Sequence, residues 1–224
     1  MKKIVAFIPA RGGSKGIPNK NIKDFAGKPL MVHSIEYALK SKLVNEVMVS
    51  TDDSKISKIS KDAGASVMKR PPKLCTDTAT TESAIEHYLH SSKVKPDIII
   101  LLQVTSPLRP KGSLDEALRH FQKGGYDSLL SICSTHRFFW QVKDDNTASA
   151  EYDYLNRPRR QDMKLEDVRF IENGSLYIFS HAHFEKTGNR LGGKIGFVEW
   201  PEDCNIEIDT ITDFKILEGI FLEK

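Results

Sequence analysis

A basic segment rich in glycine follows the first apolar run of the chain. It reads Pro9-Ala10-Arg11-Gly12-Gly13-Ser14-Lys15-Gly16-Ile17-Pro18-Asn19-Lys20-Asn21. Glycines let backbone amides approach a phosphate closely, and a guanidinium can hold two phosphate oxygens at once. Lys15 and Lys20 add two cations to Arg11, although the spacing matches neither GxxxxGK[ST] nor GxGxxG. The segment predicts a phosphate-binding loop, with a solvated basic turn as the alternative.

Two carboxylates lie close together near the other end of the chain, in Asn205-Ile206-Glu207-Ile208-Asp209-Thr210. In an extended strand, side chains two residues apart point to the same side, so Glu207 and Asp209 are expected to face one way. Mg²⁺ prefers oxygen ligands and can combine carboxylates with phosphate oxygens and water. The pattern therefore predicts a magnesium site. An exposed start of a capped helix at Thr210 and Asp213 is the alternative, and both can coexist.

The elements that would position these groups alternate along the chain. Short runs of apolar residues predict strands at 3–8, 46–50, 65–68, 97–102 and 126–133. Apolar residues at helical spacing predict helices at 29–42, 54–63, 81–91 and 112–122. Repeated strand–helix units with short links predict an α/β fold with a doubly wound, mostly parallel sheet. Ligands bind such sheets at the carboxyl ends of the strands, which directs attention to the loops after Ile8, Ser50 and Leu102.

The alternation changes between residues 136 and 184. This segment is polar and aromatic, and it contains Arg157-Pro158-Arg159-Arg160. Residues 172–179 alternate in a way that is typical of an antiparallel strand. We expect an insertion that leaves the main sheet and returns to it, within one domain that spans residues 1–224.

The segment IPARGGSKGIPNKN resembles the signature loop of nucleotide-sugar cytidylyltransferases of the acylneuraminate (CMP-sialic acid synthetase) type. The resemblance implies a nucleotide-diphospho-sugar transferase-like fold, in which this loop wraps the triphosphate of CTP. It implies nucleotide contacts for Arg11, Gly12, Gly13, Ser14, Lys15, Lys20 and Asn21. Arg11, Lys20 and Asp209 are expected to act in catalysis, and we expect Lys20 to stabilise the α-phosphate as negative charge builds up.

The segment Arg70-Pro71-Pro72-Lys73-Leu74-Cys75-Thr76-Asp77-Thr78-Ala79-Thr80-Thr81 resembles the base-reading loop of the family, RPxxLxxDxxxT. On its own it would be a proline turn that leads into a helix. Arg70 can donate to O2 and N3 of cytosine, while the Ala79 carbonyl and the Thr81 hydroxyl can accept from its amino group. Uracil reverses this pattern at N3 and at the exocyclic group and would leave buried groups unpaired.

Three further segments resemble family motifs. Leu102 to Arg109 is similar to LQPTSPLR, which implies that Gln103 reaches the acceptor sugar while Ser106 and Arg109 shape the turn. Residues 205–210 resemble IDIDT, with Glu207 in place of the first aspartate, so Mg²⁺ is expected on Glu207 and Asp209. The third segment resembles RRQDxxxxYxxNGxxYI and lies within the insertion. It implies a homodimer in which the insertion is a dimerisation platform that lends basic residues to the neighbouring subunit. The expected sugar contacts are Gln103, Arg157, Arg160 and Asn173.

The implied reaction is transfer of CMP from CTP to the anomeric hydroxyl of a nonulosonic, sialic-acid-like sugar, with release of pyrophosphate. A legionaminate- or pseudaminate-type sugar is one form of this expectation, and a supply role for cell-surface polysaccharides is another. Two alternatives stay open. One is a nucleotidylyltransferase that uses UTP, GTP or another acidic sugar such as an eight-carbon ulosonate. The other is a non-catalytic nucleotide-sugar-binding protein on the same fold.

The composition agrees with a globular enzyme that handles small anions. The chain has 224 residues, of which 39% are hydrophobic and 28% charged, and its net charge is +3. That charge does not indicate a nucleic-acid partner. The three cysteines, Cys75, Cys133 and Cys204, form no CxxC pair, so neither a disulfide framework nor a zinc site is expected. The first apolar run is short and ends at Arg11, so we expect a cytoplasmic protein without a signal peptide or membrane segment.

Overall fold

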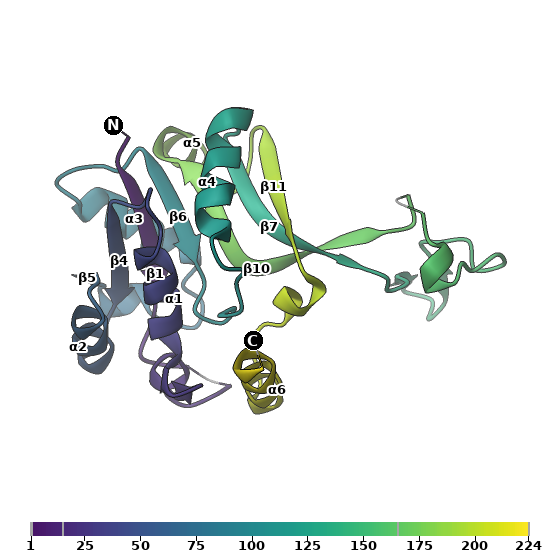
Figure 1. Cartoon of the computed structure of the whole chain (residues 1–224), viewed down its shortest axis with the longest axis horizontal. Coiled ribbons are helices and arrows are strands. Elements are labelled where there is room, and N and C mark those ends of the chain that lie inside the picture. The colour runs from purple at the N-terminus through teal and green to yellow at the C-terminus, as the bar shows by residue number, and fades with distance from the viewer. Residues whose placement is uncertain (1, 15, 165, 224) are drawn as a thin grey trace.

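A seven-stranded sheet forms the centre of the main body (Figure 1). The computed structural model describes residues 2–14, 16–164 and 166–223. The sheet has the strand order β11-β7-β10-β6-β1-β4-β5. Its strands are β1 (Ile4–Pro9), β4 (Glu46–Thr51), β5 (Ser66–Lys69), β6 (Ile98–Leu102), β7 (Ser128–Thr135), β10 (Arg169–Ser180) and β11 (Ile195–Trp200).

The pairing within this sheet confirms the predicted, mostly parallel topology. β1 pairs in parallel with β4 and β6, β4 with β5, and β7 with β11. β10 is antiparallel to both β6 and β7, as the alternation of residues 172–179 predicted. All five residues of β6 are buried because helices cover both faces of the sheet around it.

In the described parts of the chain, six α-helices pack around the sheet. They are α1 (Leu30–Leu39), α2 (Ser54–Asp62), α3 (Thr81–Ser91), α4 (Ser113–Gly124), α5 (His181–Thr187) and α6 (Ile211–Leu222). Ile98, Ile100 and Leu102 of β6 belong to a core that α1, α2, α4 and α6 complete. Ile99 and Leu101 point to the opposite core, under α3 and α5. Figure 1 shows α1 and α4 on the near face, and successive β6 residues thus divide between two helical layers.

Short elements connect or extend this frame. They are the turns η1 (Lys20–Ile22), η2 (Pro72–Leu74), η3 (Arg160–Asp162) and η4 (Glu202–Asn205), and the strand pairs β2 (Asp24–Phe25) with β3 (Lys28–Pro29) and β8 (Trp140–Val142) with β9 (Ala148–Ala150). None of the helices in the described ranges combines the length and apolar character that a membrane span requires.

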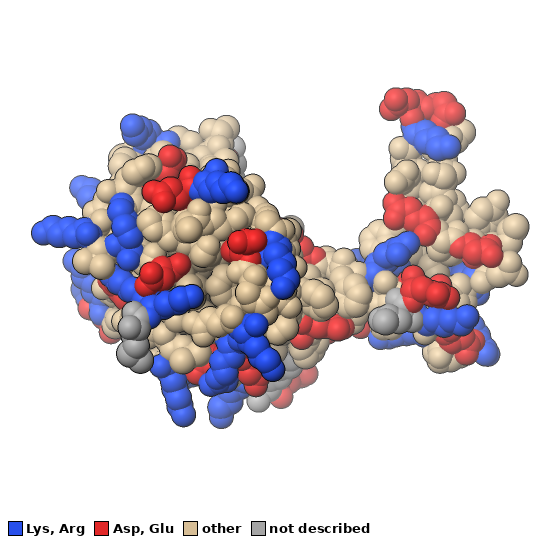
Figure 2. Space-filling view, turned by 90° about the horizontal axis from the view of Figure 1, so that it is seen from above, with Lys and Arg blue, Asp and Glu red and all other residues tan. Residues whose placement is uncertain are grey.

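The long strands β7 and β10 carry an arm away from the main body, which Figure 2 shows as a separate lobe beyond a narrow neck. We call residues 136–168 the arm. Both β8 and β9 belong to it. The later part of the predicted insertion behaves differently, because Leu176 to Ser180 pair with β6 and α5 packs on the sheet. The insertion therefore leaves the sheet and returns to it, and its projecting part is the arm.

Two local predictions differ from the structure. The first helix ends at Leu39 and not at Lys42, because Lys40 closes it and the Ser41 hydroxyl bonds to the Asp115 carboxylate. Residues 206–209 form no strand among the described residues, and the backbone N–H of Ile208 donates to the Thr105 carbonyl at 2.9 Å. The predicted capping box at Thr210 is confirmed, since both reciprocal bonds with Asp213 are present.

Candidate active site

A cleft of about 370 Å³ opens beyond the carboxyl ends of β1 and β6. Its walls come from the loop after β1, the segment before α3, the loop after β6 and the segment before α6. The lining residues are Pro9, Arg11, Ser14, Gly16, Lys20, Asn21, Arg70, Asp77, Ala79, Thr80, Thr81, Gln103, Thr105 and Asp209. The cleft lies where a parallel α/β sheet binds ligands, and it unites residues from four of the segments singled out by sequence.

Hydrogen bonds hold the loop after β1 in place, and glycine lets it pack closely against neighbouring segments. Nδ2 of Asn21 donates to the Arg11 carbonyl at 2.9 Å, and the Gly12 N–H donates to Oδ1 of Asp52 at 3.0 Å. A Cβ on Gly16 would come within 2.6 Å of the Asp209 carbonyl oxygen, so a side chain there would push the loop away from the acidic segment. Among the described residues, nothing lies within 4 Å of a Cβ placed on Gly13. Lys15, the predicted second cation of this loop, lies outside the described residues.

Arg11 joins the loop to the segment that precedes α3. Its Nη2 lies 3.0 Å from Oδ1 of Asp77, and its Nη1 donates to the Cys75 carbonyl at 3.3 Å. Both side chains are partly exposed and both line the cleft. An anion that reaches Arg11 from the cleft therefore competes with the Asp77 carboxylate for the same guanidinium.

Lys20 places an ammonium group between the loop and the acidic segment. Its Nζ donates to the Ile208 carbonyl at 2.6 Å and lies 3.9 Å from Oδ1 of Asp209. Burial lowers the pKa of Lys20, while the charges of Asp209 and Glu207 act in the opposite direction. Only 14% of the side chain is exposed, which fixes the position of the cation at the cleft wall.

The two predicted metal ligands occupy different environments. Asp209 lines the cleft and 79% of its side chain is exposed. Glu207 is partly buried over Gly174, whose φ is +63° and where a Cβ would collide with the Glu207 carboxylate. Burial raises the pKa of Glu207, and the nearby charges of Asp209 and Glu172 raise it further. The segment 206–209 pairs with no strand among the described residues, and the shared orientation of the two carboxylates stays a prediction.

The donor set nevertheless fits a hard divalent cation in part. The described residues contain no group of three or more His, Cys, Asp and Glu side chains placed to hold a metal ion. Asp209 offers an open carboxylate beside the cleft, and Glu207 lies close enough to influence the same lysine. Mg²⁺ commonly takes one or two carboxylates and fills its other positions with substrate phosphates and water. Asp209 and Glu207 suit that arrangement.

Arg70 also lines the cleft. Its side chain is buried, with 5% exposed, and its backbone N–H donates to the Thr51 carbonyl at 2.8 Å. None of the described residues accepts a hydrogen bond from its Nε. Ala79 and Thr81, which were predicted to read the base, line the same cleft. A buried arginine with a free donor beside small residues can bind the acceptor edge of a planar ligand.

The predicted sugar contacts are divided among three places. Gln103 lines the cleft directly after β6. Asn173 is wholly buried: its Oδ1 accepts from the Ser131 hydroxyl at 2.6 Å and from the Ser175 N–H at 3.2 Å. The structure thus places Asn173 in the core below the cleft, where its amide supports the β-bulge that separates Glu172 from Tyr177.

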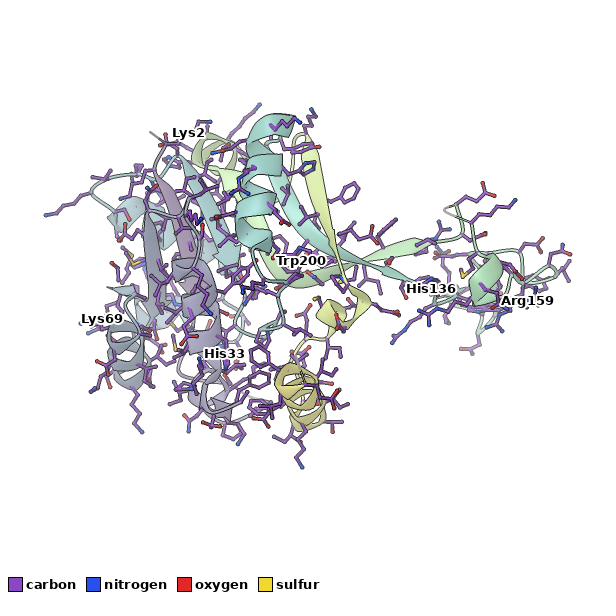
Figure 3. All side chains as sticks on the ribbon, in the orientation of Figure 1. Lys2, His33, Lys69, His136, Arg159 and Trp200 are labelled. Atoms are coloured by element: carbon purple, nitrogen blue, oxygen red, sulfur yellow. The ribbon has the colours of Figure 1, made fainter. Side chains whose placement is uncertain are left out.

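Arg157 and Arg160 lie on the arm and do not line the cleft of their own chain. The guanidinium of Arg157 stacks on the Phe138 ring at 4.4 Å, and that of Arg160 pairs with Glu202 at 3.1 Å. Figure 3 labels His136 where the arm begins and Arg159 in its outer part. Within one chain, these arginines are separated from Gln103.

Sequence reasoning assigned no role to some residues of the cleft. Asp77 belongs to the segment 70–81 before α3. Its acidic side chain is the feature of the sequence that could have indicated a role in the cleft. Thr80 lines the cleft and caps α3, since its hydroxyl accepts from the Ser83 N–H at 3.1 Å. Thr105, which joins the cleft to the acidic segment, follows Gln103 by two residues.

Comparison with known proteins relates this geometry to one group. A family model described as cytidylyltransferase matches residues 5–182. Over 221 residues the chain is 38% identical to N-acylneuraminate cytidylyltransferase of Oncorhynchus mykiss, which covers 96% of this chain and 49% of the relative. Over 219 residues it is 31% identical to N-acylneuraminate cytidylyltransferase of Escherichia coli O18:K1:H7 (strain RS218 / NMEC), with 96% and 51% covered. The chain spans about half the length of the curated relatives it matches.

Solved structures show the same fold at low identity. The structure of CMP:2-keto-3-deoxy-manno-octonic acid synthetase complexed with CTP superposes with a TM-score of 0.73 and 19% identity, covering 99% of both chains. That of 4-diphosphocytidyl-2C-methyl-D-erythritol synthase from Anaerococcus prevotii has a TM-score of 0.69 and 13% identity, covering 100% of this chain and 99% of the other. The nucleotide-diphospho-sugar transferase-like architecture predicted from the sequence is thereby confirmed.

Proposed function

Because the chain belongs to the cytidylyltransferase family, we propose that it transfers CMP from CTP to the anomeric hydroxyl of a nonulosonic sugar. The observation that carries this proposal is the cleft itself. It is lined by residues that suit each part of the reaction, namely Arg11, Lys20, Arg70, Gln103 and Asp209. Such a site can take a triphosphate, a base and an acidic acceptor in one place.

The chain's own residues would align the reactants and balance charge. The hydroxyl oxygen of the sugar attacks the α-phosphorus of CTP and its proton passes to water, while the bond from that phosphorus to the bridging oxygen breaks and pyrophosphate leaves with the electron pair. Lys20 is fixed by Ile208 and Asp209 and can stabilise the charge that develops on the α-phosphate. Arg11 would hold the departing phosphates once Asp77 has released it.

Mg²⁺ belongs to this proposal as a cofactor held by Asp209, with Glu207 as its second protein ligand. When bound, it would neutralise phosphate charge and orient the triphosphate. Asp209 is the more accessible ligand, because it faces the cleft while Glu207 is partly buried over Gly174. Cytosine would lie against Arg70, near the Ala79 carbonyl and the Thr81 hydroxyl.

The sugar would be placed from two chains. Gln103 contacts it within the cleft, and Arg157 and Arg160 would approach from the arm of a second subunit in a homodimer. The separation of the arm from the main body supports this division of roles (Figures 1 and 2). The proposal includes a cytoplasmic location, supply of activated sugar for cell-surface polysaccharides, and a sialic-acid-like acceptor that extends to legionaminate- and pseudaminate-type sugars.

A pyrophosphate-release assay tests the proposal. The purified protein is incubated with Mg²⁺, one of CTP, UTP or GTP, and one acidic sugar from a panel of nine-carbon and eight-carbon compounds. We expect release only with CTP, and with a nine-carbon sugar in preference to an eight-carbon one. Equal release with UTP would favour the broader nucleotidylyltransferase, and no release with any sugar would favour a non-catalytic binding protein.

A further inference from the structure

The Arg109 side chain forms hydrogen bonds with two backbone segments near the cleft. It follows the loop after β6, and its Nη2 donates to the Gln103 carbonyl at 2.6 Å and to the Ser175 carbonyl at 3.3 Å. Its Nη1 donates to the Ser34 hydroxyl of α1 at 3.0 Å, and its guanidinium stacks on the Tyr37 ring at 5.3 Å. One side chain thus joins the end of β6, the bulge of β10 and helix α1.

None of the described Asp or Glu side chains forms an ion pair with the Arg109 guanidinium. Neither the ion pairs nor the charges that act on Arg109 within the described ranges include an acidic side chain. Its Nε is buried and has no acceptor among the described residues. Burial lowers the pKa of Arg109 to about 10, so the group stays charged at neutral pH. Burying a charge is costly unless it is hydrogen-bonded, and the two carbonyls and one hydroxyl that Arg109 holds offset part of that cost.

The carbonyls that Arg109 holds belong to a network that reaches the cleft. The Gln103 N–H donates to the Ser175 carbonyl at 3.4 Å, and the Ser175 hydroxyl donates to the Ser106 carbonyl at 3.1 Å. Thr105 lies between Gln103 and Ser106 in the sequence, and its carbonyl accepts from the Ile208 N–H at 2.9 Å. The loop after β6 is therefore joined to the β10 bulge and to the acidic segment.

We propose that Arg109 is a positioning residue that aims the Gln103 side chain into the cleft by fixing the Gln103 and Ser175 carbonyls together. This inference rests on the proposed function, in which Gln103 contacts the acidic sugar. It assigns Arg109 an effect on the acceptor sugar that differs from its effect on the nucleotide. Arg70 and the loop after β1 are held by other bonds, so the nucleotide side of the cleft does not depend on Arg109.

Arg109→Lys is the test variant, because a lysine keeps the charge but cannot hold two carbonyls and a hydroxyl with one planar group. Arg190→Lys is a matched control. Arg190 also stacks on a tyrosine, Tyr177, at 4.6 Å and also has a buried Nε without a described acceptor, but it pairs with Glu82 and has no bond to Gln103. Ser34→Ala is a second, milder variant that removes the bond to Nη1 and leaves both carbonyl bonds to be made.

The experiment combines steady-state kinetics with amide hydrogen exchange. In Arg109→Lys we expect the KM for the acidic sugar to rise about 10-fold and the KM for CTP to change by less than about 2-fold. Exchange in residues 103–106 and 173–176 should accelerate, while exchange in β4 should not. Ser34→Ala should shift the same quantities in the same direction by a smaller factor, and Arg190→Lys should leave the ratio of the two KM values unchanged.

Equal changes in both KM values, or a changed ratio in Arg190→Lys as well, would overturn the positioning role and leave Arg109 as a general support of the fold. A higher sugar KM with unaltered exchange at residues 103–106 would also overturn it. A wild-type protein that released no pyrophosphate would contradict the proposed function instead, and the exchange comparison would then still decide whether Arg109 holds the Gln103 segment.

Discussion

The cleft and the arm both present basic side chains that the sequence connects with anions. The two regions hold these positive charges in different ways. In the cleft, Lys20 is anchored to a backbone carbonyl and is only 14% exposed. On the arm, Arg159 pairs with Asp162, and Arg160 pairs with Glu202 of η4 outside the arm; the side chains of these four residues are between 47% and 74% exposed. Figure 2 shows basic and acidic side chains interspersed on the arm.

This difference indicates separate tasks for the two regions. A cation held by the core at the ends of parallel strands needs no reorganisation when negative charge develops, which is the requirement for transition-state stabilisation. Exposed pairs are worth little and exchange partners readily, which suits recognition of a ligand held in the cleft of another chain. We therefore expect substitutions in the cleft to affect the chemical step and substitutions on the arm to affect sugar binding.

The largest effect is expected for Lys20→Ala. Removing the anchored ammonium should lower kcat by at least about 100-fold, because no other described lysine lines the cleft. Pyrophosphate release at saturating CTP and sugar measures the change. Lys23→Ala is the control, since Lys23 is exposed three residues further on and lies outside the cleft. A near-normal kcat in Lys20→Ala with an intact fold would contradict the role assigned to Lys20.

Asp209→Asn should come next. Losing the carboxylate that faces the cleft should raise the Mg²⁺ concentration for half-maximal activity by roughly 10- to 100-fold. Glu207→Gln should have a smaller effect, because the raised pKa of Glu207 reflects partial burial away from the cleft. Activity is measured against Mg²⁺ concentration for both variants. The opposite ranking would make Glu207 the principal ligand.

The arm is tested by combining Arg157→Ala and Arg160→Ala. The KM for the sugar should rise by about 10-fold, as expected for one lost charged hydrogen bond, with the KM for CTP unchanged. At a sugar concentration below the raised KM, mixing this variant with Lys20→Ala should restore activity, because a hybrid dimer has one cleft with Lys20 served by an intact arm from the other chain. Mixed dimers without restored activity would show that the arm does not serve the neighbouring cleft.

Asp77→Asn should have the smallest effect, and it should strengthen CTP binding where the other variants impair function. In the exposed Arg11–Asp77 pair, the Asp77 carboxylate competes with nucleotide phosphates for the Arg11 guanidinium. Its loss should therefore tighten CTP binding by about 2- to 5-fold at low salt. Calorimetric titration with CTP measures this. Asp162→Asn is a matched control on the arm, where Asp162 pairs with Arg159 at similar exposure. Weaker CTP binding in Asp77→Asn would instead make Asp77 a ligand-binding group.

The sequence predicted the frame of the cleft well, because local patterns determine it. Thr81–Ser91 is a helix over the predicted range, and the apolar run that ends at Leu102 is the buried central strand. The Thr210 capping box is present as expected. In these segments, periodicity and turn chemistry agree with the tertiary structure.

What the sequence did not predict depends on contacts between distant segments. The burial of Asn173 follows from a bulge in β10 and from Ser131 on the neighbouring strand, neither of which alternation along one strand reveals. Glu207 is partly buried because it lies over Gly174, and its segment is bonded to the Thr105 carbonyl and not to a strand partner. The Arg11–Asp77 pair likewise joins two loops that are 66 positions apart in the sequence.

A crystal structure with CTP and Mg²⁺ tests the central claim most directly. We expect the α-phosphate within hydrogen-bonding distance of Lys20, the cytosine against Arg70, and Arg11 released from Asp77 to bind the outer phosphates. Nucleotide density on the arm, or in the cleft with the base and the triphosphate exchanged, would contradict it.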